Sequence, residues 1–531
     1  MTRLTARLGA LLAVVVLAAG VGAVNAQPRV SNPDTLLYGV YWEPVNLDPH
    51  AITDWASMWM LDNTYETLVR YSTKQVQNKT VGTADVQPHL AEGIDVSADG
   101  VTYTFRLRHG VKFHSGDEMT ADTVRYSINR MLALALGPSR LISEFITPTS
   151  TEVVDRYTVR VKLTKPSPLF LQLMAGTNTG AIVNPKTVDA HGGITPGKGN
   201  DWMSRNVDGT GPFTWGEWRA GESFELVANP NYWQGAPKLR RIAFRIIRDF
   251  NTQLLLLLRG ELDIVYRLPP EMTAQLIGNP DVVINRENGI GMHQIWMNNR
   301  MSPFDNKKVR QAFLYALDPY AINRAVAFGY AETAKSAVPS PLEGWTGKFW
   351  PYKVDPVKAK SLLAEAGYAN GFHTEIYYNA GNSEREKTAI SAQAQLKKAG
   401  IDVEVRSIPW PTFVSNYEEG KIPLFVLSGL GLPIVEDYLI SNFHSKNHGA
   451  RGNYAFYTNK EVDSLIDQLL TAREADKRRS IIGDVQRFVN DDAPSAWIYN
   501  SLLFYAQRKW VKGWVLYPSG NWYFYPVQKS L

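Results

Sequence analysis

The 531-residue chain contains no cysteine. The fold therefore has no disulfide bonds and depends on its hydrophobic core alone. A chain of about 500 residues exceeds what one core usually holds, so two or three domains are expected.

Neither sign of charge is in large excess, because 56 Lys and Arg stand against 51 Asp and Glu. No basic stripe of the kind found in nucleic-acid-binding proteins is visible, so nucleic acid is not an expected partner. Aromatic residues are abundant, with 15 Trp and 25 Tyr. Trp and Tyr combine a large apolar surface with a polar group, which suits a ligand pocket, although packing in the core is their commoner role.

The N-terminus has the pattern of a cleaved export signal. Arg3 and Arg7 precede an apolar run over residues 8–23, and Val24–Ala26 supplies small residues for cleavage. There is no twin arginine, which favours the general secretory route. Gln27 would be the first mature residue, where a lipid anchor would need cysteine. We therefore predict a signal peptide over 1–26 and a mature protein without a stable membrane anchor, located in a periplasm.

Motifs of the common secreted hydrolases are missing. The sequence has no Gly-x-Ser-x-Gly elbow, no His-Glu-x-x-His and no Ser-x-x-Lys with Lys-Thr-Gly. Residues 192–198 resemble a phosphate loop, but Gly199 stands where the Mg²⁺-binding hydroxyl belongs. His444 and His448 are spaced as two metal ligands on a helix, but their surroundings indicate a loop and no third ligand is evident. We expect no catalytic residues, metal or cofactor.

The first part of the chain predicts an α+β unit. Alternating apolar residues predict strands over 101–108 and 157–163, and Thr120 is the expected N-cap of a helix between them. A buried strand is expected over 36–41 and a helix over 58–69.

The second part predicts crossover units. Helices over 355–367 and 384–398 alternate with strands at 376–378 and 401–405, which indicates a mostly parallel sheet. Residues 497–525 are strand-like and aromatic, and the sequence leaves open whether they return to the first lobe.

Six segments, in the same order, resemble the extracellular solute-binding proteins, family 5, of peptide, nickel and related ABC importers. They are Pro88–Glu92, Tyr103–Gly116, Gly209–Phe213, Asn229–Trp233, Pro303–Ala312 and Asp355–Tyr368.

This resemblance implies an α/β fold of the periplasmic binding protein type II-like kind, with two lobes, a hinge and an additional inserted α+β domain. The expected divisions are lobe I over 27–72, 208–290 and 497–531, the inserted domain over 73–207, and lobe II over 291–496. Binding energy would drive closure of the lobes, provided the ligand binds the closed form better than the open one.

The resemblance also suggests ligand-binding residues. Arg385 matches a position where dipeptide receptors bind the ligand carboxylate, and Trp410 matches an aromatic residue of the pocket. Tyr41, Trp42 and Trp55 lie on segments that face the cleft from the first lobe. For each of these residues, packing or plain exposure is the alternative role.

One loop departs from the family pattern. Related peptide receptors hold the ligand ammonium with an Asp that follows a Gly. The matching loop of this chain contains Ser428, Gly429, Leu430 and Gly431, so Leu430 or Gly431 stands in place of that Asp. Glu436 and Asp437 stand where the family starts a helix, which favours a capping role over ammonium binding.

The leading hypothesis is a monomeric periplasmic binding protein, not an enzyme, that captures a peptide-like or carboxylate-bearing solute and delivers it to ABC permease subunits. An oligosaccharide receptor of the same class is the alternative. A secreted hydrolase and a chaperone that holds peptides are further alternatives.

Overall fold

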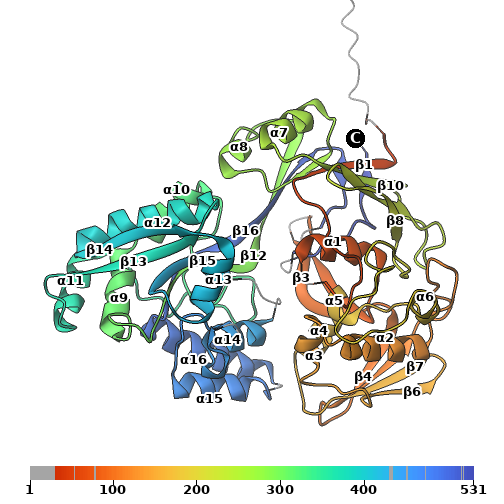
Figure 1. Ribbon diagram of the computed structural model, residues 1–531, viewed down its shortest axis with the longest axis horizontal. Coiled ribbons are helices and arrows are strands. Elements are labelled where there is room, and N and C mark those ends of the chain that lie inside the picture. The colour runs from red at the N-terminus through yellow and green to blue at the C-terminus, as the bar shows by residue number, and fades with distance from the viewer. Residues whose placement is uncertain are drawn as a thin grey trace, which may run out of the picture.

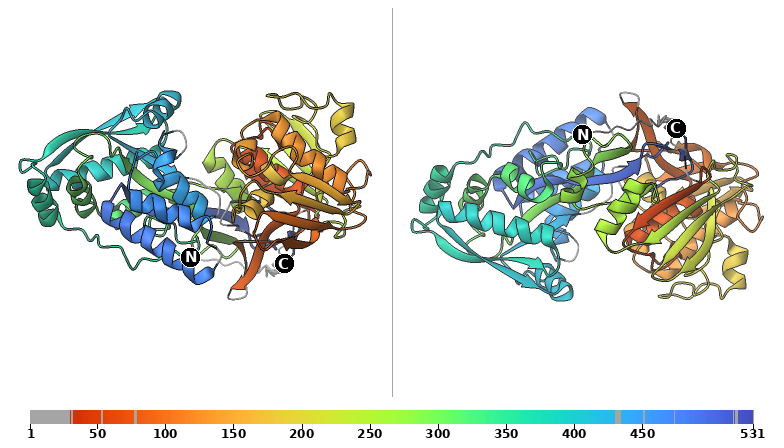
Figure 2. Two further views of the ribbon diagram at one scale, coloured as in Figure 1. Left: turned by 90° about the horizontal axis from the view of Figure 1, so that it is seen from below. Right: turned by 90° about the horizontal axis from the view of Figure 1, so that it is seen from above.

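Two lobes face each other in the computed structural model (Figure 1), and the views in Figure 2 show the same two bodies side by side. The structure describes residues 30, 32–52, 54–76, 79–429, 434–449, 452–472, 474–515, 517 and 520–530. The predicted signal peptide, Leu430 and Gly431 lie outside these residues.

A ten-stranded sheet runs through both lobes in the order β14-β13-β15-β12-β16-β11-β1-β10-β9-β8. The strands of lobe II are β13 (Phe372–Asn379), β14 (Ile401–Ile408) and β15 (Leu424–Gly429). Those of lobe I are β1 (Thr35–Val40), β8 (Phe213–Arg219), β9 (Ser223–Ala228), β10 (Arg241–Ile246) and β11 (Ile264–Tyr266). Strand β13 pairs in parallel with β14 and β15, which confirms the predicted crossover units.

Two long strands, β12 (Val282–Met297) and β16 (Ser495–Arg508), connect the lobes (Figure 1). They pair with each other in antiparallel fashion, but the register shifts between Asn288 and Met292 and again between His293 and Gln294. Residues 282–288 of β12 pair with 502–508 of β16, and residues 292–296 pair with 495–500. The ladder is therefore irregular midway between the lobes.

A separate α+β unit is packed on lobe I, as the sequence predicted. Its four-stranded sheet has the order β4-β5-β7-β6. These strands are β4 (Ala91–Val96), β5 (Thr102–Leu107), β6 (Thr151–Asp155) and β7 (Thr158–Lys162). A hairpin of β2 (Val69–Val76) and β3 (Lys79–Pro88) precedes it. Its helices are α2 (Ala121–Leu134), α3 (Ser139–Ile142), α4 (Phe170–Ala175), α5 (Thr177–Gly180) and α6 (Pro185–Ala190).

Local sequence signals explain where several helices begin. Asp355 accepts the backbone N–H of Lys358 at the start of α11, and Asn382 does the same for Arg385 at the start of α12. The remaining helices of lobe II are α9 (Lys307–Ala316), α10 (Pro319–Ala327), α11 (Pro356–Glu365), α12 (Ser383–Leu396), α13 (Trp410–Glu418), α14 (Val435–Phe443), α15 (Lys460–Leu469) and α16 (Ala475–Asp492). Lobe I adds α1 (Trp55–Thr64), α7 (Phe250–Arg259) and α8 (Pro270–Ala274).

The helix predicted over 58–69 is misplaced, because α1 spans Trp55–Thr64. It starts earlier because Asp54 caps it by accepting the N–H of Ser57 at 2.8 Å. It ends earlier because Tyr65 is extended and the Thr64 carbonyl accepts the N–H of Gly211 at 3.1 Å. Added side-chain carbon at Gly211 would lie 2.6 Å from the Asn63 carbonyl oxygen, so only glycine allows this approach.

The C-terminal segment returns to lobe I, but only its first half is a long strand. After β16, the described residues hold just the short pair β17 (Val511–Lys512) and β18 (Gln528–Lys529). Trp522 is fully buried in the core of lobe I, and Asn63 of α1 donates to its carbonyl at 3.0 Å. Residues near both ends of the chain therefore contribute to the core of lobe I.

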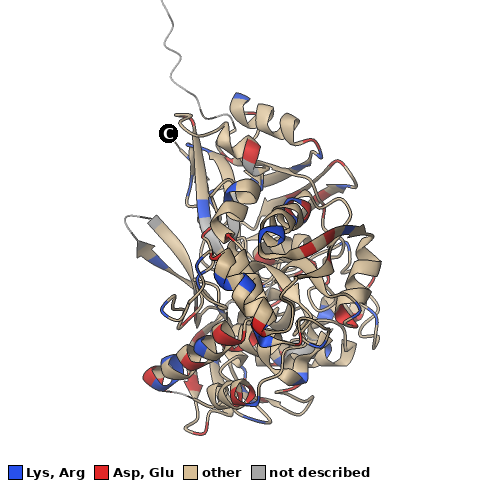
Figure 3. Ribbon diagram, turned by 90° about the vertical axis from the view of Figure 1, so that its left-hand side faces the viewer, with Lys and Arg blue, Asp and Glu red and all other residues tan. Residues whose placement is uncertain are grey.

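No helix among the described residues is long and apolar enough to cross a membrane. Lys and Arg are interspersed with Asp and Glu along the helices of the face that Figure 3 shows.

Candidate functional site

Tyr41, the first residue expected to line the cleft from lobe I, directly follows β1. Its side chain is 39% exposed, and its ring lies 5.5 Å from Phe250 and 6.3 Å from Tyr266 between centroids. Tyr41 therefore presents an aromatic surface that a ligand can cover.

Trp42 and Trp55 belong to an aromatic cluster in lobe I. The Trp42 ring lies 5.1 Å from Trp59 and 5.7 Å from Trp522, and Trp55 lies 6.5 Å from Trp59. Both are half-buried. The Trp42 indole N–H is inaccessible to solvent and has no hydrogen-bond partner among the described residues. Packing within lobe I thus accounts for the observed contacts of both side chains. Their contact with a ligand stays a prediction.

Arg385 lies in the first turn of α12 and reaches toward α13. Its Nη1 donates to Asn379 Oδ1 at 2.6 Å, and its guanidinium carbon lies 5.6 Å from the Trp410 ring centre and 6.0 Å from that of Phe413. Burial lowers the pKa of Arg385, and the carboxylate of Glu384 opposes that shift. No carboxylate of the described residues lies within 4 Å of the guanidinium, so this partly desolvated cation lacks a close counter-ion.

Trp410 and the end of β15 complete the predicted lobe II wall. Trp410 is the first residue of α13 and is 49% exposed. Ser428 Oγ lies 2.8 Å from Nδ1 of His293, and Gly429 pairs with Met292 of β12. The structure thus brings Arg385 and Trp410 together, while Ser428 is engaged with the strand that connects the lobes.

No sequence pattern indicated the polar group around Glu384. The Tyr499 hydroxyl, on β16, donates to Glu384 Oε1 at 2.6 Å. His293, on β12, stacks on Tyr499 with 4.6 Å between centroids and contacts Thr388 Oγ1 at 2.9 Å. Burial lowers the pKa of His293, so the imidazole is neutral at pH 7. Glu384 therefore lies next to side chains of both connecting strands, His293 of β12 and Tyr499 of β16. The sequence indicated only its position at the start of a helix.

Arg267 is a second residue that no sequence pattern indicated. It directly follows β11 and has a φ of 48°, a left-handed backbone conformation that is uncommon outside glycine. Its side chain is exposed, whereas Tyr266 and Leu268 beside it are buried. The guanidinium carbon lies 5.8 Å from the Tyr266 ring centre. Burial raises the pKa of Glu384, but its neighbours, among them the charges of Arg267 and Arg385, lower it overall.

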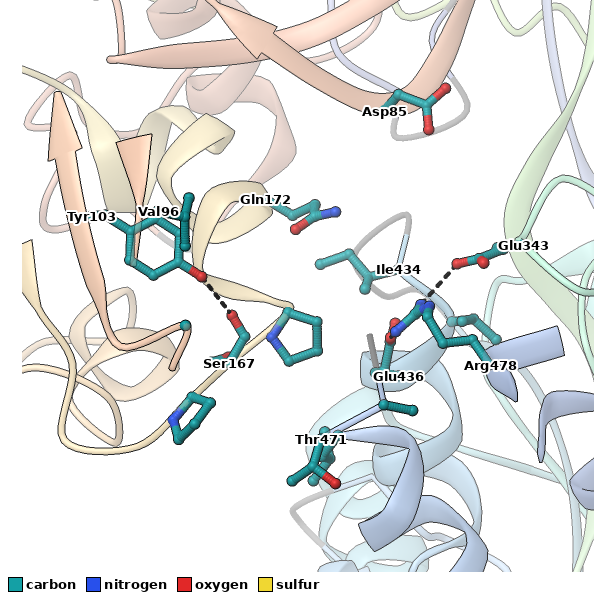
Figure 4. Close-up of a pocket in the computed structure, with 16 residues that line it drawn as sticks. Asp85, Val96, Tyr103, Ser167, Gln172, Glu343, Ile434, Glu436, Thr471 and Arg478 are labelled. Carbon is teal, nitrogen blue, oxygen red and sulfur yellow. Dashed lines mark hydrogen bonds and ion pairs between the residues drawn. The ribbon is translucent and has the colours of Figure 1, made fainter. Parts of the chain in front are cut away.

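A cavity of about 420 Å³ lies elsewhere between the lobes (Figure 4). The inserted unit contributes Tyr103, Ser167 and Gln172, and lobe II contributes Ile434, Glu436 and Arg478. It shares no lining residue with the group around Arg385. This cavity, between the inserted unit and lobe II, is therefore separate from the ligand-binding residues that the sequence predicted.

Glu436 and Asp437 lie in the first turn of α14, where the sequence predicted the start of a helix, and the side chain of the N-cap residue Ile434 forms no capping hydrogen bond. Glu436 is almost fully buried and forms an ion pair with Arg478 of α16, which also pairs with Glu343 at 2.7 Å. Its buried position in an ion pair leaves Glu436 unsuited to bind a ligand ammonium.

The two histidines singled out by spacing do not form a metal site. His444 lies 3.4 Å from Asp463 and 3.3 Å from Asp467, while His448 Nε2 contacts the Tyr457 carbonyl at 2.9 Å. The carboxylates beside His444 come from α15, 19 and 23 residues further along, and sequence spacing could not reveal them. Within the described part of the chain, no group of three or more His, Asp or Glu is arranged to hold a metal ion.

With this geometry established, comparison with known proteins identifies the family. The profile described as "Bacterial extracellular solute-binding proteins, family 5 Middle" matches residues 85–451. The chain belongs to this family. Its two-lobe α/β fold with an inserted unit is that of the family 5 periplasmic binding proteins.

Individual relatives cover nearly the whole chain. Heme-binding protein A of Haemophilus influenzae is 30% identical over 528 residues, covering 95% of this chain and 94% of the relative. Glutathione-binding protein GsiB of Shigella dysenteriae is 29% identical over 486 residues, covering 89% of this chain and 90% of the relative. The structure of HbpA2 from Haemophilus parasuis superimposes with a TM-score of 0.82 at 26% identity, covering 94% of this chain and 100% of that chain.

Family membership fixes the general role. Family 5 proteins are periplasmic solute-binding components of ABC importers, which bind small ligands or peptides and are not enzymes. The chain is accordingly a family 5 solute-binding protein.

Proposed function

We propose that this solute-binding protein captures a peptide or peptide-like solute with a carboxylate by closing its lobes, and then delivers it to the permease. The observation that carries this proposal is Arg385. Its guanidinium is partly desolvated, lies over the Trp410 ring and has no carboxylate within 4 Å among the described residues. A ligand carboxylate can supply the missing counter-ion through two parallel hydrogen bonds.

The ligands in the relatives' names fit this chemistry. Heme and glutathione differ in size and shape, but both carry carboxylates. Glutathione is in addition a small peptide, so it is the first ligand to test.

The hinge in this proposal lies at the irregular middle of β12 and β16. The register shift between Asn288 and Met292 supports the expected division between lobe I and lobe II at residues 290 and 291. The division of the chain into lobe I (27–72, 208–290, 497–531), the inserted domain (73–207) and lobe II (291–496) is part of the same proposal. Fewer regular ladder bonds at this point make bending less costly there than within either lobe.

The test begins with the natural ligand. The protein is purified without refolding, unfolded, and the released small molecules are identified by mass spectrometry. Titration calorimetry then compares the wild type with Arg385→Ala, which should weaken binding of a carboxylate-bearing solute about 10- to 100-fold. Arg205→Ala is the matched control, because Arg205, in the inserted domain, also lies over a tryptophan, 4.1 Å from the ring centre of Trp218.

Two results would refute the proposal. One is an anionic ligand whose affinity is unchanged by Arg385→Ala. The other is a small-angle scattering profile that stays the same with and without the identified ligand, because capture by closure requires the lobes to move. A released solute that the protein cleaves on incubation would favour a hydrolase.

A further inference from the structure

A pocket of about 490 Å³ lies where the inserted domain meets lobe I. One wall comes from residues 202–207, and the other comes from residues 215–220 of β8 and the turn after it. Strand β8 ends the large sheet on the lobe I side, and Figure 1 shows it on the side of that lobe away from lobe II. None of the residues that the sequence predicted for ligand binding lines this pocket. Its volume falls within the range of about 300–1,000 Å³ that is usual for small-molecule sites.

A β-bulge builds the aromatic wall of this pocket. Trp215 pairs with Leu226 of β9 and Trp218 pairs with Phe224, so β8 has one more residue than β9 between these two pairs. Residues three apart in a regular strand point to opposite faces, and the extra residue brings both indoles to the same pocket. Their ring centres lie 5.6 Å apart with an angle of 81° between the planes. The two indoles therefore form a corner in which a ligand ring can contact both.

Trp202 adds a third indole from the segment before β8. Its ring is stacked on His191, with 4.2 Å between centroids and 6° between the planes, which fixes its orientation. The indole N–H groups of Trp202 and Trp215 donate to no described residue and are not buried, so both are available to a ligand. The indole N–H of Trp218, in contrast, donates to Glu43 at 3.2 Å.

The pocket carries a positive charge that is not paired. Arg205 is exposed, and its guanidinium carbon lies 4.1 Å from the ring centre of Trp218. No carboxylate of the described residues lies within 4 Å of this guanidinium, and no described Asp or Glu lines the pocket. Asp201, the acid closest to Arg205 in the sequence, pairs with Lys198 at 2.7 Å. The pocket therefore combines aromatic surface, free N–H donors and one cation.

This combination is complementary to an acidic sugar. A sugar ring has apolar C–H groups on its faces and oxygen atoms around its edge, so it can pack against indoles while its oxygens accept their N–H groups. A carboxylate on the ring can form charge-assisted hydrogen bonds with Arg205. A quaternary ammonium, which other aromatic cages bind, is repelled by the same arginine.

We propose that this pocket binds a hexuronic acid, a six-membered sugar ring with one carboxylate, either free or as a unit of an acidic glycan. Arg205 binds the carboxylate, and the indoles of Trp202 and Trp215 contact the ring and its oxygen atoms. This site is separate from the cleft and goes beyond the proposed function. It gives the outer side of lobe I a ligand of its own.

Galacturonic acid is the probe, and galactose, which has a hydroxymethyl group in place of the carboxylate, is the matched comparison. Because the chain has only 15 Trp, proton–nitrogen NMR spectra of tryptophan-labelled protein contain few indole signals. Trp202→Phe and Trp215→Phe assign the two signals of interest. We expect both signals to shift with millimolar galacturonate, and binding of galactose to be about 10-fold weaker.

Arg205→Ala is the decisive variant, because this side chain is exposed and its loss spares the fold. It should weaken galacturonate binding about 10-fold and leave galactose binding unchanged, with partial recovery in Arg205→Lys. Arg300→Ala is the matched control, because Arg300 lies 3.6 Å from the ring centre of Phe456 in lobe II and should not affect either sugar. Trigalacturonate that binds more tightly than the monomer indicates a glycan as the ligand, whereas equal affinity indicates the free sugar.

The proposal is overturned if millimolar galacturonate leaves the Trp202 and Trp215 signals unshifted. Equal galacturonate affinity of the wild type and Arg205→Ala also overturns it, and so do equal shifts with acetate, which lacks the ring. Galacturonate binding that depends on Arg385, but not on Arg205, would place this sugar in the cleft. That result contradicts only the present inference and leaves the proposed function intact.

Discussion

The Tyr499 hydroxyl donates a 2.6 Å hydrogen bond to Glu384, and this contact joins β16 to the first turn of α12. Strand β16 passes through both lobes, whereas α12 belongs to lobe II and carries Arg385. The hydrogen bond therefore connects the backbone between the lobes to the helix that presents the candidate ligand-binding charges.

Tyr499→Phe tests this connection. The Tyr499 hydrogen bond lowers the pKa of Glu384, so its loss should raise that pKa. The ring and its stacking on His293 are retained. The pKa is measured by carbon NMR of labelled glutamate side chains, with Glu384→Gln to assign the signal. Tyr378→Phe removes the equivalent bond to Glu386 and should leave Glu384 unchanged. An unaltered Glu384 titration in Tyr499→Phe would contradict this account.

A double-mutant cycle on Arg385 and Trp410 separates the carboxylate receptor from the oligosaccharide receptor. Because the guanidinium lies 5.6 Å from the Trp410 ring centre, the two residues should be coupled by about 0.5–2 kcal/mol in carboxylate binding. Binding by Trp410→Phe should stay close to that of the wild type. If Trp410→Ala abolishes binding while Arg385→Ala has no effect, the ligand is a sugar stacked on Trp410.

Much of the framework could be predicted because local patterns determine it. The strands expected over 101–108 and 157–163 correspond to β5 and β7, since one face of each is buried and every second residue is apolar. The helix from Ser383 corresponds closely to the one expected over 384–398. These elements depend on neighbours in sequence.

The site was less predictable because it depends on contacts distant in sequence. Glu384 and Tyr499 are 115 residues apart, and nothing in either segment indicates that they meet. Arg267 has no periodic signal, and its positive φ is visible only in the structure. Arg385 and Trp410 were indicated by resemblance to the family, not by spacing.

Asp62 should make stability depend on pH. Burial raises its pKa from 3.8 to about 6, although Thr177, Asn521 and the Trp522 N–H donate to it. A pKa that is higher in the folded chain favours folding below the unfolded value, and this contribution is lost as the pH rises through about 6. Asp62→Asn should therefore gain on the order of 2 kcal/mol relative to the wild type between about pH 4 and pH 8. Urea unfolding of both proteins measures this difference, and a constant difference across that range would contradict the prediction.

The ion pair between Glu436 and Arg478, at the cavity of Figure 4, should be important for the stability of lobe II. Arg478→Ala leaves the buried carboxylate of Glu436 without its partner, which costs about 3–5 kcal/mol. Replacing both residues, as in Glu436→Leu with Arg478→Met, should cost much less, since no buried charge remains. Thermal unfolding of the single and double variants tests this order. A double variant as unstable as Arg478→Ala would show that packing, not charge, explains the loss.

Strand β16 is the neighbour of both β11 and β12, yet it is formed by residues 495–508 of a 531-residue chain. A polypeptide that ends before residue 495 lacks β16, which lies between β11 and β12 in the sheet. These two strands then become unpaired edges between lobe I and lobe II. Such a fragment presents unpaired backbone to proteases and to other chains. A chain without β16 therefore cannot complete the sheet, and its two lobes lose the strand pairing that joins them.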